Sequence, residues 1–113
     1  PRQSSFSVDY CMDPPAELAK AFKTQNDLGF PGGMLVTNPI PEEFAMRKAT
    51  IDAAIAQAVA ECNAKGIKGK ETTPFLLARV AELTGGKSLA SNIQLVYNNA
   101  KVAAQTAVHY CNI

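Results

Sequence analysis

The residues best suited to bind a ligand are the asparagines of a long helical pattern near the C-terminal end, Asn92, Asn98 and Asn99. Asparagine is a mediocre helix former because its amide competes for backbone hydrogen bonds. Near the buried face of a helix, such an amide either satisfies a neighbouring backbone group or faces a ligand. The residues alone leave both interpretations open.

A second candidate is Gly86-Lys87-Ser88 at a predicted helix start, which is similar to the end of a phosphate-binding loop, G-x-x-x-x-G-K-[ST]. The position of the first glycine is held by Ala81, and the preceding residues are helical where that loop requires a strand. We therefore interpret this tripeptide as helix capping, although a helix N-terminus can still attract an anion.

The cysteines and the histidine form no metal-binding or catalytic motif. Cys11, Cys62 and Cys111 lack a spacing such as C-x-x-C, and the single histidine, His109, lies near the C-terminal end. Scattered thiols in odd number fit the cytoplasm or another reducing compartment better than a disulfide framework. We expect Cys62 to be buried on an apolar helix face. We expect His109 to lie at the surface or in the C-terminal turn, with a role as acid or base as the alternative.

Composition places the 113 residues in one soluble globular domain at most, or in part of one. Hydrophobic residues make up 47% and charged residues 19%, and the formal net charge is +1. This balance gives no electrostatic reason to expect nucleic acid or membrane partners. No apolar run could span a bilayer and no signal peptide is visible. Because the chain starts at Pro1, we expect its original N-terminus to be missing or processed.

The first third of the chain predicts two strands around one helix. Alternation over Phe6–Tyr10 indicates a strand with one buried face. Pro14 and Pro15 close off this strand and open a helix that ends near Gly29. Met34–Val36, an apolar run between turn residues, is typical of a strand covered on both faces.

The loop Asn38–Glu43 contains two prolines with one residue between them, which exclude a regular helix. It follows the C-terminal end of a predicted buried strand, where open α/β sheets usually bind ligands. The alternative is a rigid surface turn with solvated glutamates.

Three helices are predicted downstream. Thr50 caps the first, which ends at Gly66, Thr73 caps the second, which ends at Gly85, and Ser88 caps the third. Their predicted buried stripes are Ile51, Ile55, Val59 and Cys62; Leu76, Val80 and Leu83; and Leu89, Ile93, Val96, Ala100, Ala103, Ala107 and Tyr110. A buried strand needs neighbours that these helices cannot supply, so we predict part of a larger α/β domain.

Three runs carry a resemblance to a known family: GGMLVTNPIPEEFA (residues 32–45), GIKGKETTPFLLARVAELTGG (66–86) and SLASNIQLVYNNA (88–100). They closely resemble the C-terminal portion of pseudouridine-5'-phosphate glycosidase. The resemblance runs from about Arg2 to about Ala107, and it implies that residues 1–113 form the C-terminal portion of that domain. It also implies the fold class: a helix-rich part of an α/β/α layered domain, with one or two strands in this segment.

The resemblance implies an enzyme that reversibly cleaves the C–C bond between uracil and ribose 5-phosphate in pseudouridine 5'-phosphate. Members use a lysine imine as electron sink, a glutamate as acid-base group, and a divalent metal, usually manganese, beside an aspartate. They assemble as homotrimers. These catalytic and metal-binding residues fall before Pro1 in the family pattern, so none is expected here, and the chain alone is expected to be inactive.

One substrate-binding residue carries over directly: Asn92 lines up with a family asparagine that faces uracil. The resemblance also places Asn38, with its loop, and Thr72 and Thr73 at the border of the same pocket for a small nucleotide substrate. A different class of function remains open, a stand-alone helical binding or assembly module without catalysis.

Overall fold

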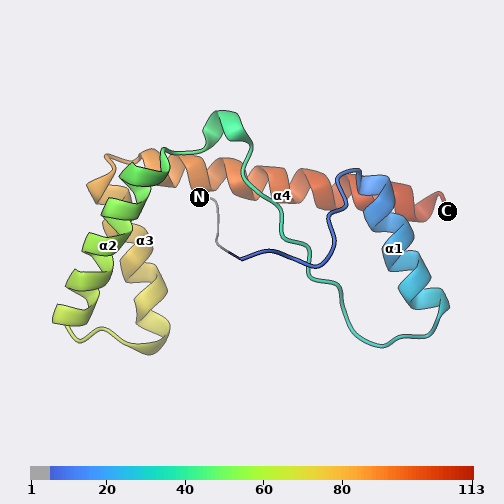
Figure 1. Cartoon of the computed structure of the whole chain (residues 1–113), viewed down its shortest axis with the longest axis horizontal. Coiled ribbons are helices and arrows are strands. Elements are labelled where there is room, and N and C mark those ends of the chain that lie inside the picture. The colour runs from blue at the N-terminus through green and yellow to red at the C-terminus, as the bar shows by residue number, and fades with distance from the viewer. Residues whose placement is uncertain (1–5) are drawn as a thin grey trace. The chain divides into compact units, whose positions relative to one another are not determined.

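The computed structural model describes residues 6–113, which divide into two compact units (Figure 1). One unit comprises residues 39–95, and the other comprises residues 6–38 and 96–113. Helix α4, Lys87–Cys111, contributes to both units. None of the helices formed by the described residues is long and apolar enough to cross a membrane.

The unit of residues 39–95 is built on α2, Lys48–Ala64, and α3, Thr72–Leu83, which lie side by side (Figure 1). Two 3-10 turns, η1 at Glu42–Phe44 and η2 at Gly69–Glu71, precede these two helices. The buried residues of α2 are Ile51, Ala54, Ala58 and Cys62. Its two alanines present little side chain, which lets α3 approach closely.

The stripe predicted for α2 was therefore wrong in its two middle positions. Ile55 is only half-buried and Val59 remains 39% exposed, whereas Ile51 and Cys62 are buried as predicted. The helix turns its alanines inward because the neighbouring helix packs against the smaller face. On α3, the predicted stripe of Leu76, Val80 and Leu83 is half-buried.

The predicted helix stops are confirmed, since Gly66 and Gly85 have φ of +69° and +59°. Such left-handed backbone suits glycine, which has no Cβ to clash with the following carbonyl. After α2, the amide of Ile67 donates to the carbonyl of Cys62 at 3.1 Å and closes the helix end.

The predicted N-caps were wrong at all three helices. Helix α2 begins before Thr50, and α3 begins at Thr72 because η2 leads straight into it, so Thr73 is already helical. At α4, Thr84 takes the role assigned to Ser88: its hydroxyl accepts a hydrogen bond from the Ser88 amide at 3.1 Å. The same hydroxyl donates to the carbonyl of Val80 at 2.8 Å, which ties the end of α3 to the start of α4.

The unit of residues 6–38 and 96–113 holds α1, Pro15–Asp27, and the C-terminal part of α4. Pro15 stands at the first helical position and Gly29, at φ +73°, lies just past the end, as predicted. Leu18 and Ala19 are the buried residues of α1.

The helix-rich prediction is confirmed, but the strand predictions were wrong for the part of the chain that the structure describes. Neither Phe6–Tyr10 nor Met34–Val36 forms a strand. A strand exists only when a neighbour pairs with its backbone, and residues 6–113 supply no such neighbour.

The stripe predicted for α4 was also wrong over most of its length. Leu89, Ile93 and Val96 are 54%, 41% and 55% exposed. The better-covered positions include Ser91, Val102 and Thr106, which lie outside the predicted stripe, and Tyr110, which belongs to it. Ser91 is 4% exposed, and its hydroxyl donates a hydrogen bond to the carbonyl of Phe44 at 2.5 Å, so η1 covers this position of α4.

Candidate functional site

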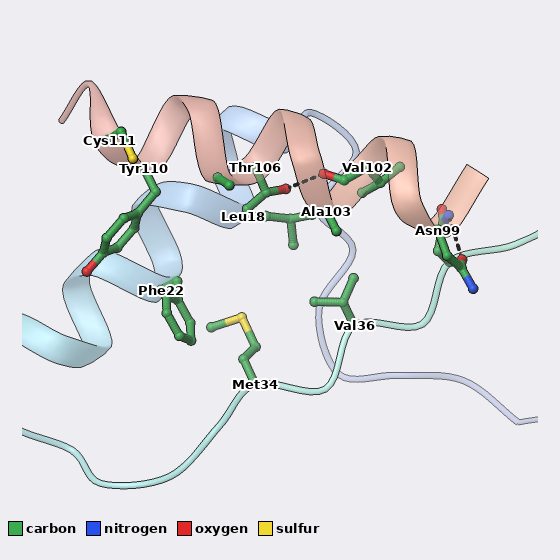
Figure 2. Close-up of a pocket in the computed structure, with 12 residues that line it drawn as sticks. Leu18, Phe22, Met34, Val36, Asn99, Val102, Ala103, Thr106, Tyr110 and Cys111 are labelled. Atoms are coloured by element: carbon green, nitrogen blue, oxygen red, sulfur yellow. Dashed lines mark hydrogen bonds between the residues drawn. The ribbon is translucent and has the colours of Figure 1, made fainter. Parts of the chain in front are cut away.

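A mainly apolar groove lies within the unit of residues 6–38 and 96–113, between α1, the segment around Met34 and α4 (Figure 2). We call it the α1–α4 groove. Its volume is about 580 Å³. The lining residues are Leu18, Phe22, Met34, Val36, Asn38, Asn99, Val102, Ala103, Thr106, Ala107, Tyr110 and Cys111.

Contacts between α1 and the last turns of α4 fix one end of this groove. The rings of Phe22 and Tyr110 meet edge to face, with centroids 5.8 Å apart and planes at 62°. The side-chain amide of Asn26 donates to the Tyr110 hydroxyl at 3.1 Å. On α4, the Thr106 hydroxyl is satisfied by the carbonyl of Val102 at 2.8 Å (Figure 2). Little polar surface therefore remains at this end.

The polar part of the groove is a pair of amides, Asn38 and Asn99, of which Asn99 is labelled in Figure 2. The Nδ2 of Asn38 donates to the Oδ1 of Asn99 at 3.0 Å. Asn99 thus pairs with another side chain rather than with the backbone. The pair still leaves the carbonyl oxygen of Asn38 and the amino group of Asn99 to hydrogen-bond a further group.

The other predicted substrate-binding residues lie in the unit of residues 39–95. Asn92 is half-buried on α4, and its amide makes no hydrogen bond with any described residue. No backbone group is therefore seen to need this amide. Thr72 is half-buried and Thr73 exposed at the start of α3. That Asn38, Thr72, Thr73 and Asn92 border one pocket stays a prediction.

An ion pair between described residues of this unit joins α2 to α3. The Glu61 carboxylate accepts hydrogen bonds from Nε and Nη2 of Arg79 at 2.6 and 3.0 Å. These bonds, with a further one from Gln57, lower the pKa of Glu61 to about 2. The bonds to Glu61, with another to Glu82, raise the pKa of Arg79. Within residues 6–113, no group of three or more His, Cys, Asp or Glu side chains could hold a metal ion.

The three cysteines are free thiols in different surroundings. Cys62 is buried and contacts the carbonyl of Ile67, as the predicted buried position requires. Cys11 is exposed, and its hydrogen bond to the Asp13 carboxylate raises the pKa of the thiol. Cys111 is exposed and lines the groove. His109 is exposed, as predicted.

The tripeptide Gly86-Lys87-Ser88 follows α3 and begins α4. The residues before it are helical, so the strand of a phosphate-binding loop is missing at this place. An anion at this helix start would need free N–H groups. The Ser88 amide is not free, because it donates a hydrogen bond to the Thr84 hydroxyl. The structure agrees with the capping interpretation, with Thr84 as the capping side chain.

The sequence did not single out the groove itself. Tyr110 was recognised only as a member of an apolar stripe, and nothing in the spacing of Phe22 and Tyr110 shows that the two rings meet. Met34 and Val36 could have been identified from the sequence, because a short apolar run outside any helix indicates side chains that pack against another element.

Comparison with known proteins gives one consistent family. Residues 1–109 match the family model described as Indigoidine synthase A like protein. The chain is 58% identical to pseudouridine-5'-phosphate glycosidase of Escherichia coli (strain K12) over 109 residues, which are 96% of this chain and 35% of that protein. It is 53% identical to the protein of the same name from Hahella chejuensis (strain KCTC 2396), over 96% of this chain and 36% of that protein.

A solved structure agrees with these relatives. The prealnumycin C-glycosynthase AlnA, in complex with ribulose 5-phosphate, is 31% identical with a TM-score of 0.80. The similarity covers 96% of this chain and 36% of that chain. The chain thus spans about a third of the length of the relatives that it matches.

Proposed function

The chain belongs to the Indigoidine synthase A like protein family, and from this membership we propose that it forms part of a pseudouridine-5'-phosphate glycosidase. The complete enzyme would cleave the C–C bond of pseudouridine 5'-phosphate to give uracil and ribose 5-phosphate. The observation that carries the proposal is 58% identity over 96% of the chain to the Escherichia coli enzyme of that name. The solved relative binds ribulose 5-phosphate, which supports a sugar phosphate as the class of substrate.

The residues of this chain divide the work with the rest of the enzyme. The imine lysine, the acid-base glutamate and the aspartate beside manganese would come from the two thirds of the family sequence outside this chain. The described residues offer no metal-binding cluster of their own, so we assign no metal-dependent step to them. In this proposal, the described residues hold the base. The complete enzyme would be a homotrimer, in a reducing compartment such as the cytoplasm.

Asn92 is the residue we propose to hold uracil. Its amide has a donor and an acceptor, and the edge of uracil presents both kinds of partner. The amide is half-buried and bound to no described residue, so it is available to a ligand. Asn38, Thr72 and Thr73 would border the same pocket in the complete enzyme.

A chimeric enzyme tests this proposal. Residues 1–109 of this chain would replace the matched third of the Escherichia coli relative, with that relative as the control. We expect the chimera to release uracil from pseudouridine 5'-phosphate and the isolated chain to release none. A folded chimera without activity would contradict the proposal and favour a helical binding module. Activity of the isolated chain would contradict the division of labour.

A further inference from the structure

Ser91 is a buried residue of α4 and directly precedes Asn92. A serine inside a helix usually points to solvent or bonds the carbonyl four residues before it. Ser91 instead donates its hydroxyl to the carbonyl of Phe44, 47 positions away, at 2.5 Å, and the residue is only 4% exposed. The bond therefore joins α4 to η1 rather than satisfying a group of its own helix.

The segment η1, Glu42–Phe44, is held weakly by burial. None of its residues is buried, and Phe44 is 41% exposed. The Phe44 amide donates to the Pro41 carbonyl at 2.9 Å, and the Ala45 amide donates to the Glu42 carbonyl at 3.1 Å. These two bonds shape the turn but do not attach it to a helix. Because a segment with little buried surface opens easily, the bond from Ser91 is important for keeping η1 in place.

We propose that Ser91 is a positioning residue for uracil: its bond to Phe44 holds η1 beside the turn of α4 that carries Asn92, so that η1 forms a wall of the base pocket. Ser91 and Asn92 are consecutive, so their Cα atoms are about 3.8 Å apart and belong to the same turn. Phe44, Ser91 and Asn92 all lie in the unit of residues 39–95. The inference rests on the proposed function, in which Asn92 holds the base.

The loss of this bond should act on the affinity for the base. When η1 is in place for only a fraction of the time, the apparent dissociation constant for uracil rises in inverse proportion to that fraction. Saturating uracil selects the molecules in which η1 is attached, so kcat should change little. Ribose 5-phosphate would bind through residues outside this chain, so its KM should not respond.

The alternative is that Ser91 only stabilises the fold. In that case, its removal lowers the free energy of unfolding, but the folded molecules bind uracil as before. The two roles therefore differ in the KM for one substrate, which stability measurements do not detect.

The experiment follows the synthesis direction of the chimeric enzyme, in which uracil and ribose 5-phosphate are separate substrates. For Ser91→Ala, we expect KM for uracil to rise about three- to tenfold, the effect of one ordinary hydrogen bond. Both kcat and the KM for ribose 5-phosphate should stay within about twofold. Ser91→Thr keeps the hydroxyl and should restore most of the affinity. Ser88→Ala, at a half-buried serine of the same helix, is the control.

A second variant loosens η1 without changing α4. Pro41 leads into η1 with φ −55° and ψ 135°, and Pro41→Gly removes the ring that restricts this backbone. It should raise KM for uracil and leave KM for ribose 5-phosphate unchanged, as Ser91→Ala does. In the 113-residue chain, Ser91→Ala should also speed amide hydrogen exchange at Phe44 and Ala45 by about threefold or more. This measurement is independent of activity.

The outcomes separate this inference from the function on which it rests. A folded chimera with Ser91 in place and no activity would contradict the proposed function, and the positioning role with it. An active chimera in which Ser91→Ala and Pro41→Gly leave KM for uracil unchanged would overturn the positioning role alone. So would a rise in KM for both substrates, which indicates a general loss of structure. Unchanged exchange at Phe44 and Ala45 in Ser91→Ala would show that Ser91 does not hold η1.

Discussion

Arg79 and Glu61 join α3 to α2 through two hydrogen bonds, from Nε to Oε2 at 2.6 Å and from Nη2 to Oε1 at 3.0 Å. Both side chains are less than a third exposed, at 29% and 28%. The fork of the guanidinium matches the two carboxylate oxygens, which is the strongest geometry for such a pair. The two helices are thereby linked by a group that titrates.

The stability of the α2–α3 pair should consequently fall in acid. The pKa of Glu61 lies at about 2 in the folded chain, against an ordinary value of 4.5. Because the pKa of Glu61 is lower in the folded chain than in the unfolded one, its carboxylate stabilises the fold fully above pH 4.5. This contribution to the free energy of unfolding is lost as the pH falls toward 2. Urea unfolding between pH 7 and pH 2.5 should show this loss in the natural chain and a smaller loss in Glu61→Gln.

Glu82→Gln is the control for that experiment. Glu82 also binds Arg79, at 2.8 Å, but its side chain is 67% exposed, so the acid dependence of this variant should stay close to that of the natural chain. An acid dependence in Glu61→Gln equal to that of the natural chain would show that other groups are responsible.

Thr84→Val should lower the free energy of unfolding by about 1 kcal/mol, the typical effect of losing a helix cap. The substitution keeps the shape of the side chain but removes the hydroxyl that bonds the Ser88 amide and the Val80 carbonyl. Thr84→Ser keeps the hydroxyl, so its free energy of unfolding should fall much less. Chemical denaturation followed by circular dichroism measures both, and equal losses would exclude the hydroxyl as the cause.

Ser91→Ala should also destabilise the chain, by about 1 kcal/mol, since it removes the donor that satisfies the carbonyl of Phe44. Ser88→Ala on the same helix is the control, because the Ser88 hydroxyl makes no hydrogen bond with the described residues. Denaturation midpoints compare the two variants. If the control were as unstable as Ser91→Ala, helix propensity rather than the bond to η1 would explain the loss.

Asn92→Ala, made in the chimeric enzyme, should lower kcat/KM by about ten- to a hundredfold, because polar atoms of the base would lose a partner worth about 1–3 kcal/mol. The melting temperature should change little, since the amide bonds no described residue. Asn63→Ala, at an exposed position of α2, is the control for both measurements. A large thermal loss with unchanged kcat/KM would assign Asn92 a structural role instead.

The sequence predicted the helices and their stops well, because these depend on local chemistry. Pro15, Gly29, Gly66 and Gly85 act through their own backbone preferences, and the structure has each where it was expected. The N-cap predictions failed because neighbouring groups compete for the same role within a few residues. Thr84 lies close enough to bond the Ser88 amide, and η2 delivers the chain to Thr72 already in helical conformation.

The buried faces were harder to predict than the helices, because burial depends on the partner. The pattern of α4 favoured Leu89, Ile93 and Val96, yet contacts from η1 and α1 cover other positions. For Met34–Val36, the pattern predicted a strand that cannot form without a second one. The amide pair of Asn38 and Asn99 joins residues 61 positions apart, which no spacing rule in the sequence could reveal.

The surroundings of the three thiols make one of them suitable for selective labelling. The thiolate is the form that alkylating reagents attack, so the raised pKa of Cys11 beside Asp13 slows its labelling at neutral pH, and burial protects Cys62. Cys111 is exposed and lines the groove. A fluorophore attached there would report when the groove fills, in solution and without any substrate.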